Sequence, residues 1–364
     1  MAYTTIDNPE LYFQAKLYTG NNTGQSITLD GSEDMSPNLI WNKSRSNTEE
    51  HNLWDSVRGT GKGLVANGTG NESAWSTGVT SFNSDGWTMG TLDSMNDGSV
   101  NFIAWCWKAG TSFTNDASAT SIGSIDSAGS VSETAGFSIC GYTGVSSAGT
   151  IKHGLSTTPS VIIWKNRTSS NGWITYHHRN TSAPETDYLE LHSVNGTNDL
   201  NTIMNDTAPT SSVFSIGTEG AVGGSNTNNF ISYIFSERQG FSKFGRYQGN
   251  SSSNGVYIHT GFRPAFLIVH ASENTSGSNN WFMADNKNHS VDAGTGKNFN
   301  PIDRQLYSNL NNAADTNADV DFFANGFKFN RDGGDINYTG RTFVYFAWAE
   351  APFVNSNGVP CNAR

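Results

Sequence analysis

Three tryptophans in this chain each have a polar or hydroxyl-bearing side chain close by, and such groups could bind a sugar. The pairs are Trp54 with Asp55, Trp173 with Tyr176, and Trp281 with Asp285. An aromatic face beside hydrogen-bonding groups suits a carbohydrate, which presents apolar CH patches as well as hydroxyls. Large aromatic rings are also the usual contents of a protein core. The sequence leaves two interpretations open: a glycan or contact surface formed by Trp54, Trp173, Tyr176, Trp281 and Asp285, or one core position written three times.

Residues that could bind a metal do not form a recognisable set. Residues 315–321, with the sequence DTNADVD, begin like a calcium loop, but an EF-hand requires Gly at its sixth position and Val320 is found there. We therefore favour a solvated loop over a calcium site at 315–321. His177 and His178 are adjacent on an expected strand, so their side chains point to opposite faces and cannot share a metal. No Cys/His group has zinc spacing, and the prediction is no metal.

Catalytic motifs are equally scarce. The glycine-rich turn 59–63 (GTGKG) lacks the following helix that a phosphate-binding loop requires. The sequence has no G-x-S-x-G nucleophile elbow and no carboxylate pair that stands out from turn residues. We expect no catalytic residue and no cofactor, and predict that the protein is not an enzyme.

The composition indicates an all-β protein. Among 364 residues there are 39 Gly, 12% are aromatic and only 15% are charged, whereas about 25% charged is typical of globular domains. Short aromatic and β-branched runs separated by Gly, Asn and Ser are typical of strands and turns. The net charge of −11 argues against nucleic-acid binding, which needs Lys and Arg to replace counterions.

The same composition bears on where the chain resides. No apolar stretch is long enough to cross a membrane, and residues 1–7 lack the basic and apolar regions of a signal peptide. Cys106 and Cys140 lie in apolar runs and Cys361 lies near the end of the sequence, so we expect three free thiols rather than a disulfide framework. These features predict a chain made in a reducing cytoplasm, without membrane insertion.

A threefold internal repeat organises the chain. Four landmarks recur in order: a Tyr turn, a proline before an apolar strand, a tryptophan strand, and a closing apolar strand. The Tyr turns begin at Tyr18, Tyr142 and Tyr247, and the closing strands read NFIAWCWKA from Asn101, NFISYIFSE from Asn229 and TFVYFAWAE from Thr342. A further landmark resembles F-x-x-x-G-F, with FNSDGW from Phe82 and FANGF from Phe323, and is degenerate in the middle copy. The closing strands are apolar on both faces, which predicts a central place in a sheet.

The repeat predicts three tandem β-sandwiches of jelly-roll or lectin-like type, with minor short helices. The expected domains are 1–115, 136–240 and 241–364, with a Ser/Ala/Gly-rich linker at 116–135. Short helices are expected where Asn precedes Pro, at Asn8 and at Asn300. Contact residues are expected in loops, such as 274–278 beside Trp281.

The order of several short words resembles a known group of proteins. The words are YTGN, PNLIWNK, TSFNSDG, AWCWKAG, TSAPETDYL, FSKFG, TGFRPAF and AEAPFVNSNG, which begin at Tyr18, Pro37, Thr80, Ala104, Thr181, Phe241, Thr260 and Ala349. Together they span nearly the whole chain and are similar to repeat-containing, tail-fibre-like virion structural proteins of marine bacteriophages, especially cyanophages. That group carries no catalytic or ligand residue over to this sequence.

The resemblance implies a virion structural protein that is assembled in the host cytoplasm. The expected role is a tail appendage or fibre-associated component in host recognition, binding other phage structural proteins, a possible host surface glycan and further copies of itself as a homo-oligomer. The alternative is a capsid-decorating knob or cement protein. A less favoured alternative is a virion glycan depolymerase, which would need a carboxylate pair in a cleft. Because no trimeric coiled coil is visible at the N-terminus, the chain departs from a standard tail fibre.

Overall fold

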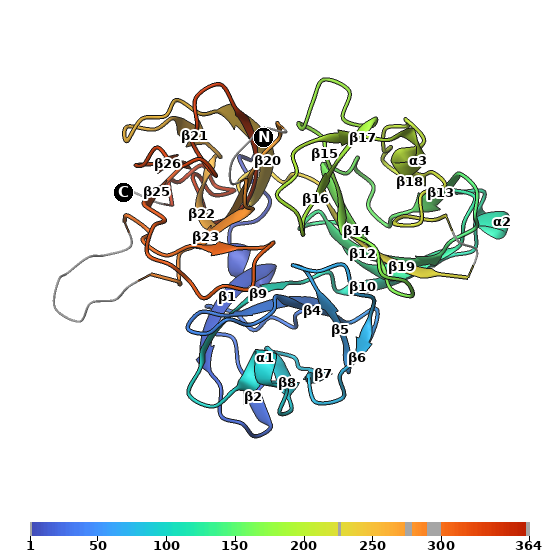
Figure 1. The fold of residues 1–364 in the computed structure, drawn as a ribbon, viewed down its shortest axis with the longest axis horizontal. Coiled ribbons are helices and arrows are strands. Elements are labelled where there is room, and N and C mark those ends of the chain that lie inside the picture. The colour runs from blue at the N-terminus through green and yellow to red at the C-terminus, as the bar shows by residue number, and fades with distance from the viewer. Residues whose placement is uncertain (1, 225–226, 274–278, 290–299, 362–364) are drawn as a thin grey trace.

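The structure, a computed structural model, describes residues 2–224, 227–273, 279–289 and 300–361. It is built almost entirely from antiparallel strands, with only short helical pieces. Figure 1 shows three lobes, coloured blue, green and orange to red along the chain, arranged around a common centre. We refer to these lobes as the first, second and third repeats.

The elements of the first repeat are η1 (Pro9–Leu11), β1 (Phe13–Thr19), β2 (Gln25–Ile27), β3 (Leu39–Ser44), β4 (Asn52–Asp55), β5 (Lys62–Val65), β6 (Ser73–Ala74), β7 (Val79–Phe82), β8 (Trp87–Met89), α1 (Asp93–Asn96) and β9 (Asn101–Trp107). Those of the second repeat are β10 (Thr111–Asn115), α2 (Ala117–Thr120), β11 (Ser127–Ser132), β12 (Phe137–Thr143), β13 (Gly149–Lys152), β14 (Val161–Asn166), β15 (Ile174–His177), β16 (Asp187–Glu190), β17 (Asn198–Asp199), α3 (Asn201–Met204), β18 (Val213–Ile216) and β19 (Asn229–Phe235). Those of the third repeat are β20 (Ser242–Gln248), β21 (Tyr257–His259), β22 (Phe262–Ala271), β23 (Phe282–Asp285), β24 (Leu306–Tyr307), β25 (Val320–Phe323), β26 (Gly326–Phe329) and β27 (Thr342–Pro352).

The large sheet of each repeat has the same strand order. The common part is β1-β9-β3-β4-β5 in the first repeat, β12-β19-β14-β15-β16 in the second and β20-β27-β22-β23-β24 in the third. The closing strands β9, β19 and β27 thus lie inside their sheets, which confirms the prediction drawn from their two apolar faces. Burial of both faces by protein explains why polar residues are nearly absent from these strands.

A small sheet covers the outer face of each large sheet. Its strands are β2-β8-β7 in the first repeat, β13-β18 in the second and β21-β26-β25 in the third. The F-x-x-x-G-F words form the β7–β8 and β25–β26 hairpins. The middle copy, where that word is degenerate, has β18 without the partner hairpin strand.

The tyrosine landmark occupies one conserved geometry in all three repeats. Tyr18, Tyr142 and Tyr247 each stack on the first apolar ring of the closing strand, with centroid distances of 5.2, 5.2 and 5.3 Å. Their hydroxyls donate to backbone carbonyls, those of Met95, Val222 and Ile336 respectively. Each ring therefore joins the first strand to the closing strand while its polar end is satisfied inside the core.

The three repeats share a core instead of standing as separate beads. One hydrophobic cluster contains Trp107 of the first repeat, Phe235 of the second and Trp348 of the third. The second and first repeats also have private clusters, between their own large and small sheets. The three repeats are therefore not independent units, because the inner faces of their large sheets bury one another.

Residues 116–135, expected as a linker, are part of the fold. They contain α2 and β11, and β11 pairs with β12 from Ser127↔Tyr142 to Ser132↔Phe137. The Ser, Ala and Gly residues that suggest flexibility also suit a strand packed closely on its neighbour: a Cβ at Gly129 would lie 1.9 Å from the carbonyl oxygen of Ile139. The linker prediction is wrong for this reason.

One of the two expected helix starts is present. Asn8 accepts a hydrogen bond of 3.1 Å from the backbone N–H of Glu10, and the 3₁₀ turn η1 follows. At residues 300–303 the chain forms no helix, and Ile302 makes an isolated β-bridge with Val320. The side-chain amide of Asn300 donates to the carbonyl of Phe322, so it secures a strand edge in place of capping a helix.

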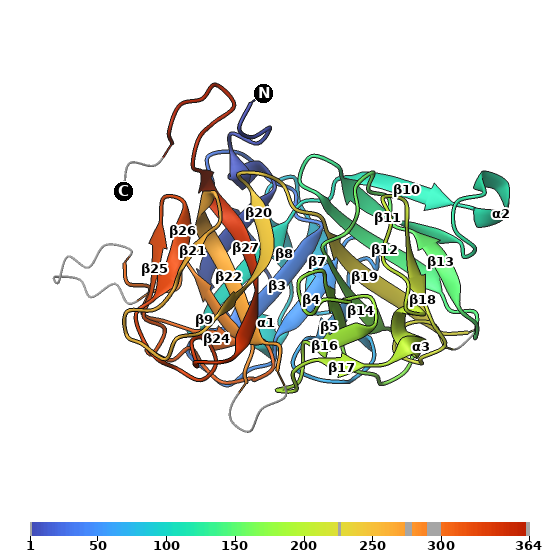
Figure 2. The same ribbon diagram turned by 90° about the horizontal axis from the view of Figure 1, so that it is seen from above.

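The ends of the described chain lie on the same side of the molecule, at the top of Figure 2. The Tyr3 hydroxyl donates to the carbonyl of Gly261, at 2.7 Å, and the backbone N–H of Ser356 donates to Asp7, at 2.6 Å. These contacts connect the first repeat to the third and so close the ring of three. No helix in the described part of the chain is long and apolar enough to cross a membrane.

Candidate functional site

The five residues predicted for a glycan surface are buried. Trp54, Trp173, Trp281 and Asp285 are 0% exposed, and Tyr176 is 4% exposed. A sugar can stack only on a ring whose face reaches solvent, so the surface hypothesis is corrected for all five residues. Their role is in the core, although Trp54 lies in a different cluster from Trp173 and Trp281, so they are not one core position written three times.

The structure also changes which residues are equivalent. In the register of the tryptophan strands, Asp55, His177 and Asp285 occupy the same position, opposite Leu39, Val161 and Phe266. The residues four positions before these three are His51, Trp173 and Trp281, which are therefore also equivalent to one another. Trp54 is three residues after His51 and therefore points to the opposite face of its sheet, where it packs in the private core of the first repeat.

Trp173, Trp281 and His51 contact the next repeat in a cyclic pattern. The indole N–H of Trp173 donates to the carbonyl of Val65 in the first repeat, at 2.7 Å, and that of Trp281 donates to the carbonyl of Glu190 in the second, at 3.0 Å. His51 of the first repeat, which is buried, faces the backbone of Tyr307 in the third. The three backbone partners are themselves equivalent, because each follows the tryptophan strand in its own sheet.

A second cyclic set uses the polar residues at the end of the tryptophan strand. Asp55 accepts from the Tyr233 hydroxyl of the second repeat at 2.8 Å, and Asp285 accepts from the Trp105 indole of the first at 3.3 Å. His177 donates from Nε2 to the carbonyl of Tyr345 in the third repeat, at 3.3 Å. The Asp55 carboxylate also forms an ion pair with Arg58, whose side chain is fully buried. Buried polar groups paired in this way fix the relative position of the repeats.

Three equivalent aromatic rings meet at the centre. Trp107 and Phe235 each contact Trp348 with ring centroids 5.3 Å apart, and they lie 6.3 Å from each other. The adjacent cavity is about 20 Å³ and wholly apolar in its lining. Such a space is comparable to a single water molecule, so the centre of the ring is a packing junction and not a ligand site.

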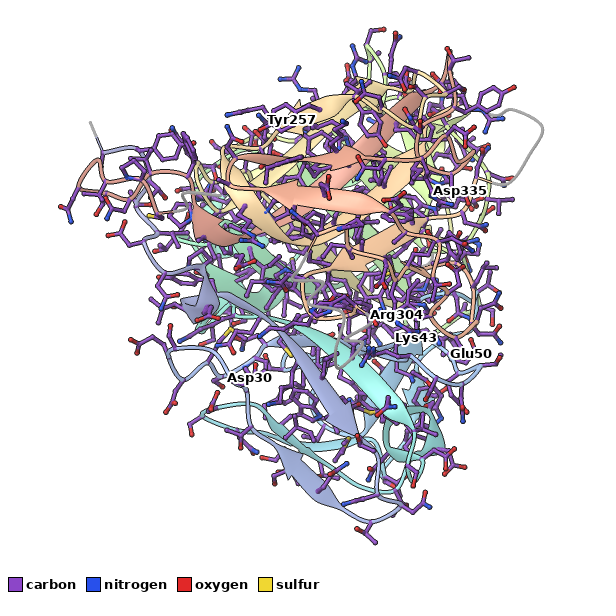
Figure 3. All side chains as sticks on the ribbon, turned by 90° about the vertical axis from the view of Figure 1, so that its left-hand side faces the viewer. Asp30, Lys43, Glu50, Tyr257, Arg304 and Asp335 are labelled. Carbon is purple, nitrogen blue, oxygen red and sulfur yellow. The ribbon has the colours of Figure 1, made fainter. Side chains whose placement is uncertain are left out.

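Three basic side chains are also buried at equivalent positions. Lys43, Lys165 and His270 are 0% exposed. Burial lowers the pKa of each lysine to about 8, and that of His270 to about 4. Lys165 donates to the carbonyl of Thr69 in the first repeat and lies 5.5 Å from the centre of the Trp173 ring. Figure 3 shows Lys43, with Glu50 and Arg304, at the level where the first and third repeats meet.

The stretches that begin like metal or phosphate motifs, 315–321 and 59–63, are turns or loops that run into the strands β25 and β5. Asp315 accepts from the backbone N–H of Asn317 at 3.0 Å and from the Gln305 side chain at 3.1 Å. His177 and His178 do not point to opposite faces as expected, because their ring centroids lie 5.6 Å apart and both rings contact backbone carbonyls of the third repeat, those of Tyr345 and Phe244. Across the residues that the structure describes, no group of three or more His, Cys, Asp or Glu could hold a metal ion. The predicted contact loop 274–278 lies outside the described residues.

The surface feature that sequence reasoning missed is an open groove of about 460 Å³ in the third repeat. Between β20 and β21 and beside the loop after β15, it is lined by basic and tyrosine side chains, among them Arg179, Lys243, Arg246, Tyr257, His259 and Tyr345. We call it the basic groove. Arg179 belongs to the second repeat, 64 or more residues before the others in the sequence, so no local pattern could assemble this set.

Comparisons with known proteins identify a family. The sequence model of a domain of unknown function, DUF7483, matches residues 8–352. The chain belongs to this DUF7483 family. The match runs from η1 to the last residue of β27, so the family domain is the whole ring of three repeats and not one lobe.

No curated protein matches the DUF7483 chain. No solved structure matches it either. Its chemistry must therefore be argued from its own residues, and among these the basic groove is the candidate site.

Proposed function

We propose that this protein is a structural component of a bacteriophage virion, exposed on the particle, and that it acts in a tail appendage that contributes to host contact. The observation that carries the proposal is the closed, interlocked body of three repeats. Side chains at the junctions, such as Trp173 and Trp281, form hydrogen bonds that join the repeats. Loops occupy the periphery. A rigid all-β body with outward loops suits a particle surface.

The resemblance of the sequence words to tail-fibre-like phage proteins supports the same role. We also infer that each repeat, a large sheet covered by a small one, is a sandwich of the jelly-roll or lectin-like type. The partners in this proposal are other tail or capsid proteins, further copies of the chain in a homo-oligomer, and a glycan of the host surface. Several copies on one particle would strengthen weak individual contacts.

One observation favours the alternative of a capsid-decorating protein. The repeats are arranged with approximate threefold symmetry, as the equivalent contacts of Trp107, Phe235 and Trp348 make plain. A pseudo-threefold body can present three similar faces to a threefold position of a shell. The body is also compact, which suits a knob better than an extended fibre shaft.

Gold labelling of intact virions with an antibody against this chain tests the proposal. Label on the tail or its fibres is the expected result. Label spread over the capsid would replace the appendage with decoration, and the absence of the chain from purified particles by mass spectrometry would remove the virion role altogether. Release of oligosaccharide from host polysaccharide by the purified protein would instead favour the depolymerase.

A further inference from the structure

The basic groove has a charge opposite to that of the protein as a whole. The chain carries a net charge of −11, yet four cationic or titratable basic side chains line this groove: Arg179, Lys243, Arg246 and His259. No Asp or Glu is among its lining residues. A local field of this sign attracts an anion to a surface that otherwise repels it.

The two arginines are available to a ligand. Arg179 and Arg246 are both exposed, and neither is in any ion pair of the described chain. The nearby carboxylate of Glu237 is already engaged, because it accepts from the backbone N–H of Phe244 at 2.9 Å and lies 3.7 Å from His178. Lys243 is tied to the carbonyl of His259 at 3.1 Å. The planar guanidinium groups can therefore each take a carboxylate or sulfate in two-point fashion.

An immobilised aromatic ring lies at the same groove. Tyr257 is 43% exposed, and Figure 3 places it at the upper edge of the third repeat, away from the boundary with the first. Its hydroxyl is hydrogen-bonded to Asn325, and its ring packs edge-on against Phe323 at 5.8 Å. A ring held from two sides can bind a partner without losing side-chain freedom.

The floor of the groove adds a further polar group. Gly245 has no side chain, and a Cβ there would lie 2.5 Å from the Tyr345 hydroxyl. The equivalent positions in the other repeats are Lys16 and Cys140, whose side chains would occupy this space. The open floor at Gly245 is thus not repeated at the equivalent positions of the first and second repeats.

From this geometry we propose that the basic groove binds an acidic glycan, with Arg179 and Arg246 on its carboxylate or sulfate groups and Tyr257 against the apolar face of a sugar ring. The volume of the groove falls within the usual range for small-ligand sites, about 300–1,000 Å³, which corresponds to one or two sugar units. The proposal deepens the proposed function by naming the class of surface glycan.

A nucleic acid fits this site less well. Polynucleotide affinity comes from an extended row of phosphate contacts, and the groove offers only a short cluster on an acidic protein. An acidic oligosaccharide of one or two units can place its charges within this short cluster and lay the apolar face of a sugar ring against Tyr257. A single-stranded polynucleotide is therefore used as a competitor in the test.

Titration calorimetry of the isolated full chain with tetragalacturonate, at low salt, measures the binding. The fully methyl-esterified tetramer is the matched ligand, because it keeps the sugar rings and loses the charge. Tetragalacturonate is expected to bind at least ten-fold more tightly than its ester, with an affinity that falls as salt is added. Equal binding of the two ligands, no binding of either, or tighter binding of the polynucleotide would each overturn the proposal.

Variants then locate the site. Arg179→Ala with Arg246→Ala is expected to weaken binding by ten-fold or more, and Tyr257→Ala by about five-fold, without a change in the melting temperature. Lys62→Ala removes an exposed cation of the first repeat and is expected to leave the affinity unchanged. An equal loss in Lys62→Ala would mean diffuse electrostatic attraction and would refute the groove. The calorimetry uses isolated protein. It can therefore show no glycan binding while gold labelling still finds the chain on the virion, or show binding while labelling finds none.

Discussion

The Tyr233 hydroxyl donates a hydrogen bond of 2.8 Å to the Asp55 carboxylate across the boundary between the second and first repeats. Both side chains are buried, and the same carboxylate neutralises the buried guanidinium of Arg58. The backbone N–H of Arg58 donates to the other carboxylate oxygen at 2.8 Å. The Asp55 carboxylate thus pairs with Arg58 inside the first repeat and accepts a hydrogen bond from Tyr233 of the second.

We expect Tyr233→Phe to lower the free energy of unfolding by about 1–2 kcal/mol, because it leaves one buried hydrogen-bond acceptor with fewer donors. Asp55→Asn should cost more, about 3–5 kcal/mol, because Arg58 would then be a buried cation without its nearest counter-charge. Urea denaturation followed by tryptophan fluorescence measures both values. Tyr257→Phe, at an exposed hydroxyl, is the control with little effect. Equal stability of Tyr233→Phe and the unmodified chain would show that the junction does not depend on this bond.

The shared core predicts that the three repeats unfold together. Isolating residues 136–240 would expose Trp173, Tyr233 and Phe235, all now buried, and each such ring loses about 1.5–3 kcal/mol of burial free energy. The full chain should therefore show one calorimetric transition, and the fragment should lack a cooperative one. Three resolved transitions in the full chain would instead describe independent domains.

Buried histidines predict a loss of stability in mild acid. Burial lowers the pKa of His177 to about 3 and those of His153 and His270 to about 4. Below pH 6.5 the unfolded chain takes up protons at these rings while the folded chain does not, so stability falls as the pH drops from about 6.5 toward 4. Asp285 opposes this in part, because burial raises its pKa to about 6, and a raised carboxyl pKa favours the folded state at lower pH.

His177→Gln isolates one histidine from this effect. Between pH 7 and pH 5 one such ring accounts for about 2 kcal/mol of the decline, so the variant should lose correspondingly less stability over that interval. Phe346→Leu, which removes packing against His177 but no titrating group, is the control and should keep the original pH dependence. An unchanged slope in His177→Gln would show that this ring is not the titrating group.

The cysteines should differ sharply in reactivity. Cys106 and Cys140 are buried and Cys361 is exposed, and burial raises the pKa of Cys140 to about 12 and that of Cys106 further. Because the thiolate is the reactive form, a thiol reagent should titrate one group rapidly in the native protein and three after denaturation. A total of one group in denaturant would reveal a disulfide.

Several features of the fold were readable from the sequence. The order of landmarks predicts three all-β repeats, and the two apolar faces of NFIAWCWKA, NFISYIFSE and TFVYFAWAE place β9, β19 and β27 inside their sheets. The Asn8-Pro9 pair marks η1. These inferences succeed because strand burial is written locally, in the alternation and composition of neighbouring residues.

What covers each face was decided only by the tertiary structure. A pattern of period two shows that Trp54 is buried, but not that it packs inside the first repeat while His51, three residues earlier, faces the third. The linker prediction for 116–135 fails because small residues allow close packing as well as flexibility, and β12 supplies the partner. Likewise Arg179 and Arg246 meet in one groove only because the second and third repeats are docked together. Contacts between distant segments form only when the three repeats close into a ring, and the local pattern of a short stretch of sequence does not specify that closure.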